Sequence, residues 1–234
     1  MSGIAVGVPN AQYNVARPGS LPVRVATHQR RRMFQAFLDA IRIESADTIL
    51  DVGATSDQGY AHSNYFEAWY PHKTRITAAG VDDASFLEQR YPGLRFVLAD
   101  GRDLPFADGA FDYVHSSAVL EHVGSRDKQA RFLGEMWRVA RKGIFATTPN
   151  RWFPVEFHTV LPIVHWLPPA AFRVLLRQIG RGFFADEQNL NLMTRRGLLR
   201  CAEQAGVPKP RVDHVRLAFW PTNLLLIGRK DSGC

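Results

Sequence analysis

The sequence predicts an α/β fold built on a mostly parallel sheet of seven strands, with helices on both faces and an antiparallel strand pair near the C-terminal end. Two observations predict it. Short apolar runs alternate with segments of helical periodicity, an order typical of a parallel sheet with right-handed crossovers. Three successive apolar runs also end in aspartate, which places acidic side chains at one edge of that sheet.

The first apolar run, residues 48–52, gives way abruptly to small and polar residues. Its composition suits a strand that is buried on both faces of a parallel sheet. Asp51 lies at the carboxyl end of this strand, where ligands bind in open α/β sheets. Gly53 allows a sharp turn and a close approach of a ligand to the main chain. This stretch therefore predicts a ligand-binding loop.

Aspartates also close the next two runs. Residues 76–81 lead to Asp82 and Asp83, and residues 94–99 lead to Asp100. An acidic side chain after a second strand is placed to accept hydrogen bonds from ribose hydroxyls. We therefore expect the aspartates to meet around a ligand that contains a ribose.

The pattern continues through residues 100–106, 111–117 and 119–123. Together with the strand-end aspartates, it resembles the class I S-adenosylmethionine (SAM) methyltransferases, and within them the type-11 group that includes quinone-biosynthesis enzymes. The resemblance covers roughly residues 48–150 and extends loosely beyond them. It implies a Rossmann-like fold, SAM as the cofactor and methyl transfer as the activity.

The resemblance also implies which residues bind the cofactor. The methionine end would contact Asp51 and Gly53, the ribose Asp82, and the adenine Asp100. The full set of implied cofactor-binding residues is Asp51, Gly53, Thr55, Asp82, Asp83, Asp100, Gly101, Arg102 and His115.

One departure from the family pattern lies in the first loop. The family's loop reads D-x-G-x-G-x-G, but here Thr55 and Asp57 stand where the second and third glycines are expected. Asp57 would bring a negative charge close to the cofactor's carboxylate. A hydroxyl or carboxylate at these positions could still accept a hydrogen bond from the cofactor's ammonium group.

Composition bounds the remaining possibilities. The chain of 234 residues suits one domain, and its net charge of +7 favours an acidic partner or an anionic membrane surface. Cys201 and Cys234 are too few for a disulfide framework, a zinc site of paired cysteines or an iron–sulfur cluster, and we expect no metal. No secretory signal and no membrane-spanning apolar run is recognisable, so we expect a cytoplasmic protein, with peripheral contact at the inner face of a membrane as an option.

Residues 1–25 are expected to form a flexible leader, and residues 26–234 one domain. The run Arg30, Arg31 and Arg32 is interpreted as a solvated helix end. The predicted helices are 27–43, 63–70, 84–91, 126–141, 169–180 and 194–205, and the predicted strands are 48–52, 76–81, 94–99, 111–116, 144–148, 211–217 and 222–228. The helix over 126–141 is predicted to be capped by Lys142 and Gly143, and the last helix by Gly206.

Residues 151–191 are interpreted as an insertion that covers the mouth of the site and contacts the acceptor. No charged residue lies between Glu156 and Arg173, while basic residues follow in the next helix. An apolar surface flanked by basic residues suits a membrane surface and an amphiphilic acceptor, but the same residues could pack as a lid or form a homodimer contact. The predicted acceptor-binding residues are Asn150, Arg151, Trp152, Glu156 and His158.

Methyl transfer from a sulfonium is an in-line displacement, so it needs positioning and, for some acceptors, a base. His115 and His158 are the candidate bases, because imidazole titrates near neutral pH. For His122, a structural hydrogen bond is as reasonable an assignment as proton transfer.

Two other functions stay open. The chain could be a binding protein that kept the fold and lost cofactor affinity through Thr55 and Asp57. A DNA or RNA methyltransferase is less favoured, because residues 115–118 lack the Asn/Asp-Pro-Pro-aromatic loop of the amino-methylating DNA enzymes and no RNA-binding module is recognisable. We therefore expect a small-molecule or lipid-like acceptor and no specific nucleic-acid partner.

Overall fold

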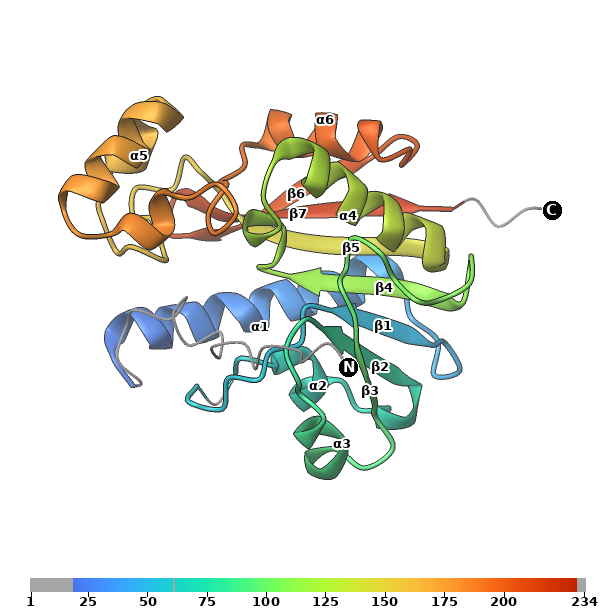
Figure 1. The fold of residues 1–234 in the computed structure, drawn as a ribbon. Coiled ribbons are helices and arrows are strands. Elements are labelled where there is room, and N and C mark those ends of the chain that lie inside the picture. The colour runs from blue at the N-terminus through green and yellow to red at the C-terminus, as the bar shows by residue number, and fades with distance from the viewer. Residues whose placement is uncertain (1–18, 61, 231–234) are drawn as a thin grey trace, which may run out of the picture.

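A computed structural model describes residues 19–60 and 62–230, which contain one seven-stranded sheet of order β3-β2-β1-β4-β5-β7-β6 (Figure 1). Strands β1 to β5 are mutually parallel, and β7 runs antiparallel to both β5 and β6. The predicted fold class is therefore confirmed. The strands are β1 (Ile49–Val52), β2 (Ile76–Gly80), β3 (Arg95–Leu98), β4 (Phe111–Ser117), β5 (Ala140–Pro149), β6 (Arg211–Leu217) and β7 (Trp220–Arg229).

Helices cover both faces of the sheet. Figure 1 shows α4 and α6 on one face and α1, α2 and α3 on the other. The helices are α1 (Leu21–Ile41), α2 (Tyr65–Trp69), α3 (Phe86–Arg90), α4 (Arg126–Val139), α5 (Pro169–Gln178) and α6 (Arg195–Gln204), with short 3-10 turns at η2 (Lys73–Arg75), η3 (Leu120–His122), η4 (Val164–Trp166) and η5 (Gly182–Ala185).

The alternation of side chains along β1 divides the core into two layers. Leu50 and Val52 pack with the α4 and α6 residues, whereas Ile49 packs with Phe37 of α1 on the opposite face. Each buried side chain of this size contributes about 1.5–3 kcal/mol relative to its exposed state. Asp51 points to the same face as Ile49, so its carboxylate enters the site from the α1 side.

Helix α4 begins where it was predicted to begin, but it ends two residues earlier. Ser125 caps its N-terminus by accepting a hydrogen bond from the Lys128 amide (3.4 Å). The predicted cap at Lys142 and Gly143 is wrong, because the helix ends at Val139 and both residues lie in β5. A Cβ on Gly143 would lie 2.6 Å from the Gly228 carbonyl oxygen, so this glycine permits close contact between two strands. At the end of α6, Gly206 has φ +79°, which confirms its predicted left-handed cap.

The predicted leader falls in two parts. Residues 1–18 lie outside the described residues, whereas residues 21–25 form the first turns of α1, so their assignment to the leader is wrong. Met33, Phe37 and Ile41 are the buried apolar residues of α1, at intervals of four. A helical face of this kind extends the ordered domain towards the N-terminus.

The insertion, residues 151–191, has a small apolar core of its own, which includes Phe172, Leu176 and Phe184. A single bridge between Asn150 and Met193 pairs the two ends of the segment. Figure 1 shows α5 away from the sheet, on the side where β7 begins. The predicted role of this insertion as a lid stays a prediction. Among the helices in the described part of the chain, none is long and apolar enough to cross a lipid bilayer.

Candidate functional site

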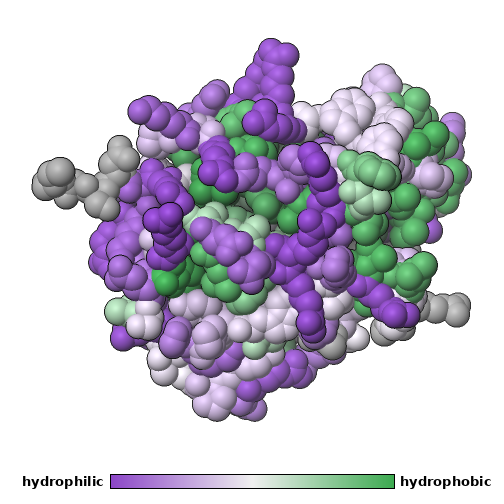
Figure 2. Space-filling view, turned by 180° about the vertical axis from the view of Figure 1, so that it is seen from behind, coloured by the Kyte–Doolittle hydropathy of each residue, from purple (hydrophilic) through white to green (hydrophobic). Residues whose placement is uncertain are grey.

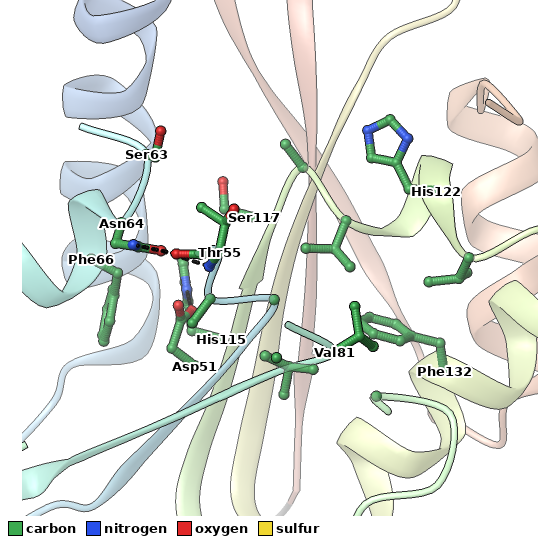
Figure 3. A pocket seen from close by; sticks show the side chains of 18 of the residues that line it. Asp51, Thr55, Ser63, Asn64, Phe66, Val81, His115, Ser117, His122 and Phe132 are labelled. Carbon is green, nitrogen blue, oxygen red and sulfur yellow. Dashed lines mark hydrogen bonds and ion pairs between the residues drawn. The ribbon is translucent and has the colours of Figure 1, made fainter. Parts of the chain in front are cut away.

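A cavity of about 430 Å³ lies at the carboxyl ends of β1, β2 and β4 (Figure 3). Strand β1 lies between β2 and β4, so the chain first winds outwards to β3 and then returns to β4 on the other side of β1. Open α/β sheets bind ligands at such a reversal of strand order. In Figure 3, Thr55 and Asn64 lie on one side of the cavity and His122 on the other.

The loop after β1 passes directly under the cavity. Gly53 has φ +114°, and a Cβ there would lie 2.1 Å from Cγ2 of Val119, so glycine is required. Asn64 fixes the next turn, because its Oδ1 accepts a hydrogen bond from the Thr55 amide (2.9 Å) and its Nδ2 donates to the Thr55 carbonyl (2.9 Å). Thr55 therefore lines the cavity in a defined position.

The Asp57 carboxylate forms hydrogen bonds within its own loop. Its Oδ1 accepts a hydrogen bond from the Gly59 amide (2.8 Å) and its Oδ2 accepts one from the Ser63 hydroxyl (3.3 Å). The side chain is buried and is not part of the cavity lining. The Asp57 carboxylate thus bonds within its own loop and does not enter the cavity, whereas its effect on cofactor binding stays a prediction.

Arg30 of α1 lines the cavity, which corrects its interpretation as part of a solvated helix end. Burial lowers the pKa of its guanidinium, an effect opposed by Tyr65 and Asp57 nearby. The neighbouring arginines point elsewhere, since Arg31 lies over the Trp69 ring (5.6 Å) and Arg32 donates to the Arg216 carbonyl. Arg30 precedes the buried Met33 by one helical turn, a signal that could have placed it on the inner face.

Asp51 and His115 form a buried pair at the floor of the cavity. His115 Nδ1 is hydrogen-bonded to Asp51 Oδ1, and the ring stacks on Phe66 (4.4 Å between ring centres). Burial raises the pKa of Asp51 to about 7 and lowers the pKa of His115 to about 3. Nε2 of the ring faces the Tyr65 hydroxyl at 3.5 Å. Both ring nitrogens thus face protein atoms, a setting that suits the positioning of Asp51; the predicted role of His115 as a base stays a prediction.

Glu67 of α2 is a cavity residue that the sequence reasoning missed. It is fully buried, and burial together with the Asp51 charge raises its pKa well above the usual range. The sequence offered one signal, since this is the only acid in the short aromatic helix α2. Ser117 and Gln188 also line the cavity without having been predicted.

The two aspartates after β2 have different surroundings. Asp83 is exposed and holds the start of α3, because its Oδ1 accepts a hydrogen bond from the Ser85 amide (2.9 Å). Asp82 is half-buried, and its Oδ2 accepts no hydrogen bond from the described residues. Burial raises the pKa of Asp82. Neither residue is part of the cavity lining, which reaches Gly80 and Val81 immediately before them.

The predicted adenine residues Asp100, Gly101 and Arg102 all line the cavity. Arg102 forms a two-pronged pair with Asp100 through Nε (2.9 Å to Oδ1) and Nη2 (2.6 Å to Oδ2). Hydrogen bonding by Arg102 lowers the pKa of Asp100. A Cβ on Gly101 would lie 2.3 Å from Cε2 of Phe132, so the main chain here is packed directly against an aromatic ring.

Histidines from two distant segments meet on the other side of the cavity. His122 Nε2 lies 3.0 Å from His158 Nε2, and both residues line the cavity. Glu156 accepts a hydrogen bond from His158 Nδ1 (2.7 Å). Burial alone would raise the pKa of Glu156, but His158 and further hydrogen bonds lower it to about 2. Two of the predicted acceptor residues, Glu156 and His158, are therefore directly linked to each other, but of the two only His158 lines the cavity.

The other three predicted acceptor residues lie away from this cavity. Asn150 donates from Nδ2 to the Pro221 carbonyl (3.0 Å), and Arg151 donates to the Leu167 carbonyl (2.7 Å). Trp152 is half exposed and packs near Trp166. Their predicted contact with an acceptor stays a prediction that the cavity lining does not support.

Comparisons with known proteins agree with this geometry. Residues 50–147 match a family model described as a methyltransferase domain, of the type-11 family. Demethylmenaquinone methyltransferase from Beutenbergia cavernae is 34% identical over 131 residues, which make up 52% of this chain and 50% of that protein. The matched region thus spans about half the length of this curated relative.

Solved methyltransferase structures share the fold over most of the chain. A SAM-dependent methyltransferase from Methanosarcina mazei superposes with a TM-score of 0.54 at 16% identity, covering 83% of this chain and 96% of that one. Magnesium protoporphyrin IX methyltransferase from Synechocystis, solved with bound S-adenosylhomocysteine (SAH), gives 0.58 at 13% identity and covers 94% and 91%. Residues 50–147 are thus similar to the type-11 methyltransferase domain, and the chain shares the fold of these solved methyltransferases.

Proposed function

We propose that the protein transfers the methyl group of SAM to a small-molecule acceptor. The observation that carries this proposal is the 430 Å³ cavity at the strand-order reversal, which brings a buried acid, a cationic side chain and a glycine-lined floor together. A cavity of this size falls within the range of small-molecule sites. The methyltransferase domain match over residues 50–147 supports the same reaction.

We place the methionine end of SAM between α1 and the loop after β1. Its carboxylate would be held by Arg30, and its ammonium group by Asp51, whose carboxylate is positioned by His115. A guanidinium suits a carboxylate because it offers several donors in one plane. Arg30 would thus provide the positive charge that a loop with Thr55 and Asp57 in place of glycines does not itself supply.

We place the nucleoside end on the other side of the Gly53 turn. Asp82 has an oxygen without a partner among the described residues and would accept hydrogen bonds from the ribose hydroxyls. Asp100, Gly101 and Arg102 would surround the adenine, with the Phe132 ring behind Gly101. This orientation directs the methyl group towards the side of the cavity that contains His122 and His158.

The chemical step needs little more than alignment. The acceptor's electron pair forms a bond to the methyl carbon while the carbon–sulfur bond breaks and its electron pair stays on sulfur. An enclosed cavity favours this step by holding both reactants close and in line. Of the two predicted bases, His158 lies at the acceptor side and is held by Glu156, whereas His115 is enclosed beneath the cofactor.

Incubation with methyl-labelled SAM and a fractionated small-molecule extract tests the proposal. We expect SAH to form, with label in a small-molecule fraction, and Asp82→Ala to reduce both. Tight SAM binding without turnover in any fraction would favour the binding-protein alternative. Label that appears only in added RNA or DNA would favour the nucleic-acid alternative.

We further propose an amphiphilic acceptor that is presented at an anionic membrane surface. In Figure 2 the apolar colour gathers on the side of the molecule that carries α5. Ile163, Val174 and Ile179 are exposed by 55%, 50% and 46%. Arg177 lies exposed beside them in α5, so apolar area and positive charge are neighbours.

Flotation with vesicles that contain anionic lipid tests this second proposal. We expect the wild type to float with vesicles and Val174→Asp/Ile179→Asp to stay in solution. Leu98→Asp is the matched control, because Leu98 is equally exposed but lies in β3 at the opposite edge of the sheet. If wild type and double variant behave alike, the apolar surface is a lid or, where the mass rises with concentration, a homodimer contact.

A further inference from the structure

We propose that Glu121, His122 and His158 bind a divalent transition-metal ion at the acceptor end of the cavity. The binding itself does not depend on methyl transfer, but the role given to the ion below rests on the proposed function. The expectation of no metal came from the cysteines, whereas this site consists of imidazoles and a carboxylate that the fold brings together.

The three side chains converge on one point. Nε2 of His122 and Nε2 of His158 lie 3.0 Å apart, and Glu121 Oε1 lies 3.9 Å from the first and 4.0 Å from the second. One possible ligand atom from each residue lies within 4.8 Å of those of the other two. Ligands about 2.0–2.2 Å from a zinc ion are separated by distances of this order.

The hydrogen bonds that the two Nδ1 atoms make determine whether the two Nε2 atoms carry a hydrogen. His122 Nδ1 faces the Asn189 carbonyl (2.6 Å), and His158 Nδ1 faces the Glu156 carboxylate (2.7 Å). A carbonyl and a carboxylate only accept, so each Nδ1 carries the hydrogen. In the neutral rings, both Nε2 atoms therefore present lone pairs to each other at 3.0 Å. Two lone pairs at this distance repel unless a cation lies between them.

Glu121 adds a carboxylate oxygen to the same point. Its side chain is fully buried, and its Oε2 accepts a hydrogen bond from Thr148 (2.8 Å). Its Oε1 is buried and accepts no hydrogen bond from any described residue. A buried carboxylate oxygen is normally hydrogen-bonded or coordinated to a metal. The three acceptors together thus form a cation site.

The surrounding residues have the arrangement of a metal site's support. Metal-binding histidines commonly donate their other ring nitrogen to a carboxylate or carbonyl, as His158 and His122 do here. Two histidines and one glutamate are also a ligand set of catalytic zinc sites, which keep one position open. His122 and His158 line the cavity, so the open position would face it.

This geometry points to an acceptor with a hydroxyl group. An oxygen in the open position would have its O–H pKa lowered by the cation, as happens with metal-bound water. The proton would leave to solvent, the oxygen would form a bond to the methyl carbon, and SAH would leave with the electron pair of the broken bond. His122 and His158 would then act as ligands, and the cation would replace a protein base.

Titration of Zn²⁺ into chelator-stripped, tag-free protein tests the proposal by calorimetry, without SAM present. We expect one equivalent to bind, and Glu121→Gln to weaken binding by more than roughly tenfold. His122→Ala/His158→Ala should abolish it. His72→Ala is the matched control, because His72 is exposed, packs near Tyr70 and is not part of the cavity lining. Glu121→Gln has nearly the same shape as the wild type, and circular dichroism of each variant separates loss of binding from loss of fold.

A second probe reports on the ligands themselves. Co²⁺ bound to the wild type should produce visible absorption bands of a low-coordinate nitrogen site, and these bands should be absent from the double variant. Equal Zn²⁺ uptake by wild type and double variant, or no uptake by either, overturns the proposal and leaves a proton shared between the two rings. SAH binding by metal-free protein is measured in parallel, so loss of the metal site and loss of the proposed function give different results.

Discussion

Replacing Arg30 by methionine tests how the cofactor's methionine end is held. Arg30 lines the cavity near Tyr65, and its two neighbours in the arginine run contact other parts of the protein. If Arg30 pairs with the cofactor's carboxylate, Arg30→Met removes a charge-assisted interaction but keeps most of the apolar stem.

The expected size of the effect follows from the kind of bond. A hydrogen bond to a charged group contributes about 1.5–3 kcal/mol, and each 1.4 kcal/mol corresponds to about a tenfold change in Kd. The Kd for SAH should therefore rise roughly 10- to 150-fold. Arg31→Met is the matched control, because Arg31 lies over Trp69 and is not part of the cavity lining. It should leave the Kd nearly unchanged.

Calorimetry with two ligands makes this test specific. SAH carries the amino-acid end, whereas 5′-methylthioadenosine lacks it and keeps the ribose and adenine. Arg30→Met should weaken the binding of SAH strongly and the binding of methylthioadenosine hardly at all. Equal weakening of both ligands, or none of either, would refute the placement of the carboxylate at Arg30.

Three further predictions concern the cavity and the residues next to it. Asp82→Ala should weaken SAH and methylthioadenosine alike, by about tenfold or more, because both contain the ribose; an unchanged Kd for both would remove Asp82 from the site. SAH affinity should fall as the pH drops below about 7, where Asp51 becomes protonated and loses its attraction for the ammonium group, and Asp51→Asn should abolish this slope. Gly101→Ala should lower the free energy of unfolding by about 1–3 kcal/mol, because the added Cβ would lie 2.3 Å from the Phe132 ring. Gly134→Ala should not lower it, because its Cβ would lie 3.6 Å from the nearest atom. Equal Tm values for the two variants in thermal unfolding would contradict the packing described for Gly101.

The sheet and the part of the cavity that the ends of β1 and β3 form could be predicted from the sequence, because their signals are local. An apolar run that ends in aspartate specifies both a strand and the edge where it ends, and this holds for Asp51 and Asp100. Gly53 likewise carries its own signal, since its left-handed turn is a property of one residue. The conformation at such positions can be predicted from the residues next to them along the chain.

The errors arose where contacts between distant segments decide the outcome. Lys142 lies in β5 and pairs with Asp47 (2.5 Å), although beside Gly143 it resembles a helix cap. Arg30 belongs to an arginine run that suits solvent, and its place one turn before the buried Met33 was the weaker of the two signals.

The side of the cavity with His122 and His158 was the least predictable part for the same reason. His122 and His158 are separated by 36 positions and meet only when the insertion folds back over η3. Asn150, Arg151 and Trp152 instead bind main-chain carbonyls or pack near another aromatic ring, contacts that no spacing in the sequence indicates.

Binding of SAH to metal-stripped wild-type protein is the most direct test of the central claim. Calorimetry should show one molecule bound per chain, with a Kd that Asp82→Ala raises and that the exposed-site variant His72→Ala leaves unchanged. Absence of heat with both SAH and SAM at millimolar concentration would contradict the assignment of this cavity as the site of a methyltransferase cofactor.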